Sequence, residues 1–161
     1  MRLALTTIPL RAAGNLPMTT FLLFAEGHYA SGQPTRLQLA ELASKDVRTV
    51  INLRPPEEPV DYEEAGEADR LGLRYVTLPI ANAGDLDHAR VQTFGRLLDQ
   101  ARTEGAVLIH CASANRVGAM VALDQVLNRG TPLATALERG RAAGLKALEP
   151  AVIALAQQQD A

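Results

Sequence analysis

The stretch His110–Gly118, HCASANRVG, follows the apolar run Ala106–Ile109 and precedes the apolar run Ala119–Leu127. The first run predicts a buried strand and the second a buried helix, so the stretch between them is a short loop of small residues. A loop that leads into a helix N-terminus presents unpaired backbone N–H groups and the positive end of the helix dipole. Oxyanions such as phosphate and sulfate bind well at such a place.

Cys111, at the end of the predicted strand, is the chain's only cysteine. A lone cysteine is most often a small buried hydrophobic residue. At the start of a helix, however, the pKa of a thiol falls from about 8.5 to roughly 3.5–7.5, which makes the thiolate available as a nucleophile. Arg116 adds a fork of donors that matches a tetrahedral oxyanion. We therefore expect Cys111 to be a nucleophile, and His110 to hold loop carbonyls or to help keep the thiolate charged.

The pattern HC…NR-x-G in His110–Gly118 resembles the active-site loop of the cysteine-dependent phosphatases, the dual-specificity and tyrosine phosphatase superfamily. Tyr29–Pro34 (YASGQP) and Val50–Arg54 (VINLR) resemble a bacterial branch of it, the beta-lactamase-hydrolase-like phosphatase domain. The similarity runs from about residue 24 to about residue 145. It implies a phosphoric monoester hydrolase that needs no cofactor: a Cys111 thiolate attacks phosphorus, and water hydrolyses the phosphocysteine.

The same resemblance implies a set of substrate contacts around Cys111 and Arg116. The loop residues expected to bind the phosphate are Ala112, Ser113, Ala114, Asn115 and Val117. Arg54 stands at the carboxyl end of the predicted strand Val47–Leu53, where open α/β sheets bind their ligands. Two interpretations of Arg54 stay open, a solvated surface charge and an accessory anion contact.

A general acid is expected in the loop Ile80–Asp87, because cysteine phosphatases take an aspartate from a mobile loop at this point in the fold. Asp87 directly precedes the predicted helix His88–Thr103 and is a good N-cap. Asp85 follows a glycine hinge and has no such role, so we assign the acid to Asp85. Asn82 holds another plausible position, but its amide could not donate the proton.

Two features depart from the familiar phosphatase loop. Cys111 and Arg116 enclose four residues where that loop has five. Four is typical of rhodanese-like sulfurtransferases, although the bacterial branch shares it, and this motivates an alternative function through a Cys111 persulfide. Ala114 stands where a glycine is expected, and at a positive φ alanine costs about 1 kcal/mol. This second departure motivates a third interpretation, a non-catalytic module that binds oxyanions or phosphoproteins.

Strands and helices alternate through the first two-thirds of the 161 residues, and helices finish the chain. This order, with the resemblance, predicts a single α/β domain of the dual-specificity phosphatase type, with a four- to five-stranded mixed sheet flanked by helices. Asp61–Leu71 is expected to be a charged surface helix. We assign residues 21–158 to the domain and residues 1–20 to an N-terminal extension.

Composition and charge indicate which classes of binding partner the sequence favours. A net charge of −2 and 4% aromatic residues favour no nucleic acid, and no apolar stretch reaches the roughly 20 residues of a membrane span. The scattered histidines show no metal-ligand spacing. Arg2–Leu10 faintly resembles a signal peptide that Arg11 interrupts, and Met18 is an alternative start. We expect a cytoplasmic protein, or a periplasmic one if that segment is a signal, acting on a phosphorylated protein or small molecule.

Overall fold

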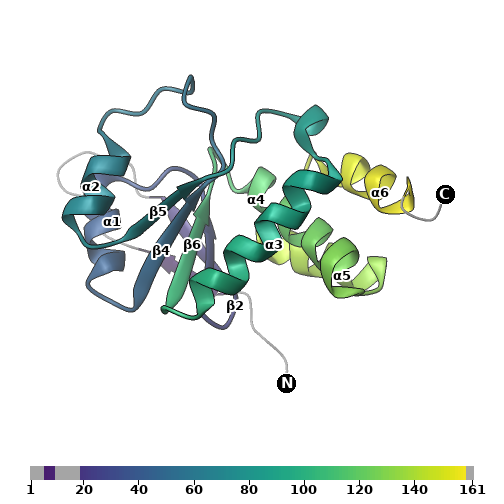
Figure 1. The fold of residues 1–161 in the computed structure, drawn as a ribbon, viewed down its shortest axis with the longest axis horizontal. Helices are drawn as coiled ribbons and strands as arrows, with labels where there is room; N and C mark the ends of the chain where they lie inside the picture. The colour runs from purple at the N-terminus through teal and green to yellow at the C-terminus, as the bar shows by residue number, and fades with distance from the viewer. Residues whose placement is uncertain (1–5, 10–18, 159–161) are drawn as a thin grey trace.

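The structure is a computed structural model and describes residues 6–9 and 19–158. A six-stranded sheet in the order β1-β2-β3-β6-β4-β5 forms its centre (Figure 1). The pairs β1–β2 and β2–β3 are antiparallel, whereas β3, β6, β4 and β5 run parallel to one another. The strands are β1 (Thr6–Pro9), β2 (Thr20–Ala25), β3 (His28–Ser31), β4 (Val47–Asn52), β5 (Arg74–Thr77) and β6 (Ala106–His110).

Helices cover both faces of the sheet (Figure 1). On one face lie α1 (Arg36–Ala43) and α2 (Glu64–Arg70). The other face carries the helices that come later in the chain, namely α3 (His88–Arg102), α4 (Asn115–Leu123) with its π-helical continuation η2 (Asp124–Asn128), α5 (Leu133–Ala142) and α6 (Glu149–Gln158). A short 3₁₀ turn, η1 (Ala83–Asp85), precedes α3.

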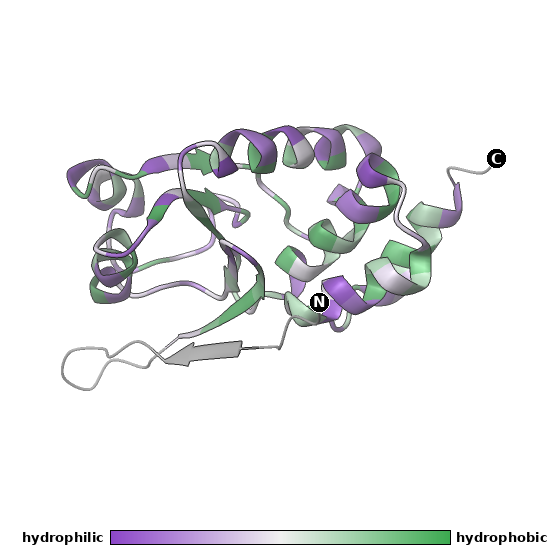
Figure 2. Cartoon of the chain, turned by 90° about the horizontal axis from the view of Figure 1, so that it is seen from below, coloured by the Kyte–Doolittle hydropathy of each residue, from purple (hydrophilic) through white to green (hydrophobic). Residues whose placement is uncertain are grey.

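Successive residues of the central strands supply two separate cores, because side chains alternate between the faces of a sheet. Val50 and Leu108 pack with α1 and α2, whereas Ile51 and Ile109 pack with the later helices. All four are fully buried. Hydrophobic and hydrophilic residues alternate along the helices (Figure 2), as expected for helices with one buried side. Every residue of β6 is buried, so the strand is covered on both faces and its carboxyl end is held from both sides.

The predicted α/β domain with a mixed sheet flanked by helices is confirmed. The sheet has one strand more than expected, because Thr6–Pro9 pairs with β2 inside the segment expected to be an extension. The other residues that carry the signal-like pattern, and Met18, lie outside the described part of the chain. Within residues 6–9 and 19–158, no helix is both long and apolar enough to cross a bilayer.

Candidate active site

Cys111 follows the last residue of β6 and is fully buried. Its backbone N–H donates to the carbonyl of Ser31 at the end of β3 at 3.2 Å, and Leu53 N–H, just beyond β4, donates to the carbonyl of His110 at 2.9 Å. The thiol therefore stands where three parallel strands end together, which is where open α/β sheets place their ligands.

The loop from Cys111 into α4 contains one strained backbone position. Ala114 has a φ of 70° and is the only non-glycine residue of the described segments with a positive φ. Gly144 lies directly behind it, since a Cβ on Gly144 would come within 2.5 Å of the Ala114 Cβ. Alanine in this conformation costs about 1 kcal/mol, and the bare backbone of Gly144 leaves it the space it needs.

The other flank of the loop is set by Gly32 in the YASGQP stretch. Gly32 forms an isolated antiparallel bridge with Ser113. A Cβ on Gly32 would lie 2.5 Å from the carbonyl oxygen of Ala112. The glycine of this motif thus allows the connection after β3 to lie against the loop and helps to set the loop's shape.

Arg116, in the first turn of α4, makes a bidentate ion pair with Glu58. Its two terminal nitrogens lie 2.7 and 2.9 Å from the carboxylate oxygens, and one of them also donates to the carbonyl of Ile80 at 2.7 Å. The pKa of Arg116 is raised, first by the hydrogen bond to Glu58 and also, against the effect of burial, by the charge of Cys111. The guanidinium is therefore held beside the thiol.

Glu58 also joins Arg54 to this cluster. Arg54 Nε lies 3.1 Å from Glu58, another nitrogen donates to the carbonyl of Pro59 at 2.7 Å, and a third donates to Gln33. Only 10% of the Arg54 side chain is exposed, so the alternative of a solvated surface charge is wrong. The pKa of Glu58 is lowered, first by the hydrogen bond from Arg116 and then, against the effect of burial, by Arg54.

His110 is fully buried, and its Nε2 lies 2.5 Å from the Glu64 carboxylate. Glu64 belongs to α2, which was expected to be a charged surface helix. Most of α2 is exposed or half-buried, but Glu64 is buried. The expectation that His110 supports the loop agrees with its Nδ1, which faces the Cys111 carbonyl oxygen at 3.4 Å.

The two acid candidates differ in their partners. Asp87 caps α3 by accepting from the N–H of Arg90 at 2.8 Å, as its position predicts. Asp85 accepts from the N–H of Ala81 at 2.8 Å and lies 3.6 Å from the Arg90 guanidinium. Among the described residues, no hydrogen bond or ion pair joins Asp85 to Cys111 or Arg116. The loop nevertheless begins at the site, because the Ile80 carbonyl binds Arg116.

The other residues predicted to bind phosphate fall into two groups: some could offer only their backbone N–H groups, and others have side chains that hold the fold. Ala112 and Ser113 are exposed at the loop surface, whereas Val117 is fully buried. The side chain of Asn115 accepts from the backbone N–H groups of Lys146 and Leu148 at 2.8 and 3.4 Å. Asn115 therefore anchors the turn before α6. No group of three or more metal-ligating side chains occurs in the segments that the structure describes.

Glu58 and Glu64 are the site residues that the sequence did not single out. Glu58 is 58 positions from Arg116, and Glu64 is 46 positions from His110. The available signal for Glu58 was its place in an acidic, proline-rich loop after the strand that ends at Asn52. Glu64 lies in a run of charged residues, where nothing in the pattern distinguishes one buried carboxylate from its exposed neighbours.

Comparison with known proteins gives a consistent result. The family model for dual-specificity and tyrosine phosphatase domains fused to NAD⁺ kinase matches residues 24–153. Beta-lactamase hydrolase-like proteins from two strains of Xylella fastidiosa are 36% identical over 102 residues. That region is 61% of this chain and 23% of theirs, so the chain spans about a quarter of the length of these relatives.

Solved structures share the fold. A DUF442 protein from Shewanella putrefaciens is 26% identical, with a TM-score of 0.66 over 86% of this chain and 89% of that one. TpbA from P. aeruginosa, solved as a cysteine-to-serine variant in complex with phosphotyrosine, is 24% identical, with a TM-score of 0.67 over 85% and 82%. At 24% identity, the similarity to TpbA shows a shared fold and nothing more.

Proposed function

Because the chain belongs to the family of dual-specificity and tyrosine phosphatase domains fused to NAD⁺ kinase, a family of phosphoric monoester hydrolases, we propose that Cys111 hydrolyses phosphate monoesters through a phosphocysteine. The observation that carries this proposal is the position of Arg116. Its guanidinium is fixed by Glu58 and the Ile80 carbonyl in the first turn of α4, five residues after Cys111. The charge of Cys111 contributes to the raised pKa of Arg116. The Cys111 thiolate can then attack an oxyanion that is bound by the N–H groups at the start of α4 and by the Arg116 guanidinium.

The hydrogen bonds of Arg116 leave room for that anion. A guanidinium has five N–H groups, and three of them bind Glu58 and Ile80. Two N–H groups remain for oxygens of a phosphate bound over Cys111. Glu58 thus takes one edge of the guanidinium and orients the rest of it, which lowers the cost of ordering Arg116 when substrate binds.

In the first chemical step the Cys111 thiolate attacks phosphorus, an S–P bond forms and the ester P–O bond breaks. The loop N–H groups from Ala112 to Val117 and the Arg116 guanidinium stabilise the equatorial oxygens. Asp85, as the protonated acid, donates a proton to the leaving oxygen, for which its carboxyl group must turn from the Ala81 N–H towards the site. Water then attacks phosphorus and gives a proton to the ionised Asp85, the S–P bond breaks, and phosphate leaves with the Cys111 thiolate restored.

Arg54 has a supporting role in this proposal. It is bound to Glu58, which is bound to Arg116, so its charge strengthens the field at the anion site through one intervening carboxylate. The substrate is a phosphorylated protein or small molecule. A reducing compartment such as the cytoplasm suits an unpaired nucleophilic thiol.

The test is a paired assay of the purified protein and its Cys111→Ser variant. One arm follows p-nitrophenol release from its phosphate ester, and the other follows thiocyanate formation from thiosulfate and cyanide. We expect phosphate-ester turnover that disappears in the variant. If neither p-nitrophenol nor thiocyanate is formed, the catalytic proposal is overturned and a module that only binds oxyanions is favoured.

Sulfur transfer is the second candidate, favoured by the four-residue interval between Cys111 and Arg116. The thiolate would take the outer sulfur of thiosulfate, releasing sulfite, and the persulfide would pass that sulfur to cyanide. This route has no leaving alkoxide or phenoxide and does not need Asp85. Thiocyanate formation without phosphate-ester hydrolysis would establish it in place of the phosphatase.

A further inference from the structure

A series of polar side chains runs behind the catalytic loop and begins at the residue before Cys111. Nε2 of His110 lies 2.5 Å from Glu64, whose side chain is only 4% exposed. Nδ1 of His110 faces the carbonyl oxygen of Cys111 at 3.4 Å. When Glu64 is ionised, both ring nitrogens of His110 therefore face hydrogen-bond acceptors.

A neutral imidazole carries one N–H and can serve only one of these acceptors, whereas an imidazolium donates from both nitrogens. We propose that Glu64 is a positioning residue that keeps His110 as an imidazolium, and that this buried positive charge favours the thiolate of Cys111. The inference rests on the proposed role of Cys111 as the nucleophile. It applies whether the thiolate attacks phosphorus or sulfur.

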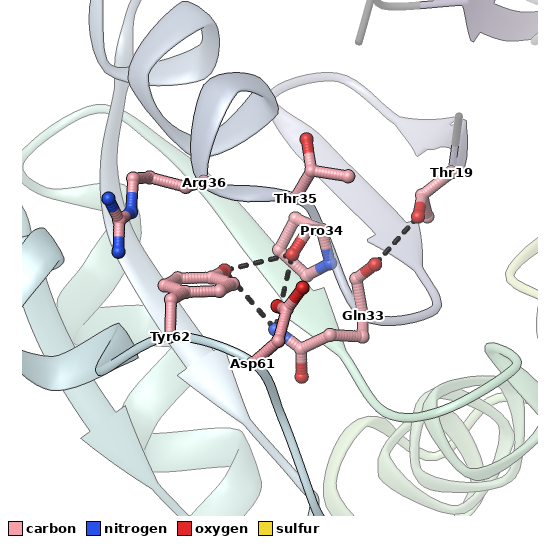
Figure 3. A pocket seen from close by; sticks show the side chains of 7 residues that line it. All are labelled: Thr19, Gln33, Pro34, Thr35, Arg36, Asp61 and Tyr62. Atoms are coloured by element: carbon pink, nitrogen blue, oxygen red, sulfur yellow. Dashed lines mark hydrogen bonds between the residues drawn. The ribbon is translucent and has the colours of Figure 1, made fainter. Parts of the chain in front are cut away.

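The second oxygen of Glu64 is fixed independently. The Gln33 side-chain amide donates to it at 2.8 Å and lies 3.3 Å from the Tyr62 hydroxyl. Figure 3 shows Gln33 pointing towards Tyr62, on the wall of a pocket of about 350 Å³. The carbonyl oxygen of the same amide accepts from Arg54. Both oxygens of Glu64 therefore have donors, as a buried ionised carboxylate requires.

The charged and titratable groups around this pair come from several elements. Beside Glu64, the pKa values of Tyr62 and Tyr75 are raised, first by burial and further by the negative charge of Glu64. The charge of Asp61 acts on Tyr62, and the charges of Glu63 and Arg54 act on Tyr75. On the side of the thiol, Arg116 interacts with the charges of Glu58 and Cys111. Of the described residues, Glu64 alone makes a side-chain hydrogen bond or ion pair with the His110 imidazole.

Glu64→Gln is a clean probe of this arrangement. The introduced amide can still accept from Gln33 and can donate to Nε2 of His110, so the hydrogen bonds persist while the negative charge is lost. His110 is then satisfied as neutral imidazole. Glu63→Gln is the matched control, because Glu63 is the adjacent residue, is exposed and makes no side-chain cap to α2.

The first readout is the pH titration of the thiolate, followed by its ultraviolet absorbance with the Cys111→Ser protein as the blank. The chain has one cysteine, so the signal comes from Cys111 alone. We expect the midpoint to rise by about one pH unit or more in Glu64→Gln, a tenfold loss of thiolate on the acidic side, and to stay unchanged in Glu63→Gln. An unchanged midpoint in a folded Glu64→Gln protein overturns the proposal.

The second readout is the pH profile of kcat/KM. Loss of thiolate lowers kcat/KM on the acidic side only, and the variant should converge with the wild type at high pH. A merely structural role for Glu64 would lower kcat/KM at every pH, and that result also overturns the proposal. Because the titration uses no substrate, a wild-type protein without phosphatase turnover refutes the proposed function and leaves the thiolate result standing.

His110→Asn provides a second test, which can be used even if the Glu64→Gln protein fails to fold. It should reproduce the upward shift of the midpoint by itself. Where the double variant folds, adding Glu64→Gln should shift the midpoint no further, because Glu64 acts through His110. A normal midpoint in folded His110→Asn contradicts the proposal as directly as the first variant would.

Discussion

The carboxylate of Glu58 meets the guanidinium of Arg116 in a bidentate pair, with nitrogen–oxygen distances of 2.7 and 2.9 Å. The two residues come from different elements, one from the loop after β4 and the other from the first turn of α4. Arg54 binds the same carboxylate. One acidic side chain therefore sets the position of both arginines.

Replacing Glu58 tests how far this pair prepares Arg116 for an anion. Glu58→Gln should lower kcat/KM for a phosphate ester by about 10- to 100-fold, because Arg116 must then be ordered at the expense of substrate binding. Steady-state kinetics would show it mainly as a higher KM. Glu57→Gln, which removes the charge of the exposed neighbour, is the control. Faster turnover in Glu58→Gln would instead mean that Glu58 competes with substrate for Arg116.

The same pair makes stability depend on acid pH. Arg116 and Arg54 hold the pKa of Glu58 below its ordinary value of 4.5. A lowered pKa contributes stability that is fully present above the unfolded value and is lost as the pH falls through the folded value. The difference in melting temperature between wild type and Glu58→Gln should therefore be constant near neutrality and shrink below about pH 4.5. A difference that grows on acidification would contradict this linkage.

Gly32 should be required for the shape of the loop. Gly32→Ala places a Cβ 2.5 Å from the carbonyl oxygen of Ala112, so the loop must shift, and a displacement of this kind costs on the order of 100-fold in rate. The measurement is kcat/KM beside the melting temperature. Gly66→Ala is the control, because its new Cβ would meet nothing nearer than 4.0 Å in exposed α2. Normal kinetics in Gly32→Ala would show that the bridge to Ser113 is dispensable.

Asp85 and Asp87 can be separated by amide substitution. Asp85→Asn should lower kcat by about 100-fold or more for an ester with a poor leaving group, and much less for p-nitrophenyl phosphate, whose leaving group needs little protonation. Asp87→Asn should have little effect, since asparagine caps a helix as well as aspartate does. Equal losses for both esters would remove Asp85 from the role of general acid.

The strain at Ala114 predicts a stabilising substitution. Ala114→Gly should raise the free energy of unfolding by about 1 kcal/mol, because glycine adopts a φ of 70° without steric cost. Ala112→Gly, in the same loop but without a positive φ, should be neutral or destabilising. Denaturant titration would compare the two. A less stable Ala114→Gly protein would mean that the packing of its methyl group outweighs the strain.

The features that could be predicted from the sequence are those that depend on a local pattern of residues. Apolar runs located β4 and β6, the position of Asp87 before a helix predicted its N-cap, and the small-residue loop predicted the surroundings of Cys111. The loop position where an expected glycine is missing, Ala114, is the one with a positive φ. Each of these inferences uses residues that lie close together along the chain.

The pairings that complete the site could not be predicted in this way. Glu58 and Glu64 reach their partners only through the packing of β4, β6 and α2, and their neighbours in the chain are equally acidic. Nothing in the sequence indicated that the Asp85 carboxylate binds Ala81. A partner brought close by the fold leaves no periodic signal in the chain.

The contact between Ala114 and Gly144 has a consequence for how this loop can change over evolution. Gly144 leaves no space for even a methyl group against Ala114, and Asn115 ties the start of α4 to the turn that follows Gly144. Inserting a fifth residue after Cys111 would have to push the loop into that turn or out over the site proposed for the anion. A longer loop in this fold would therefore need a different connection between α5 and α6.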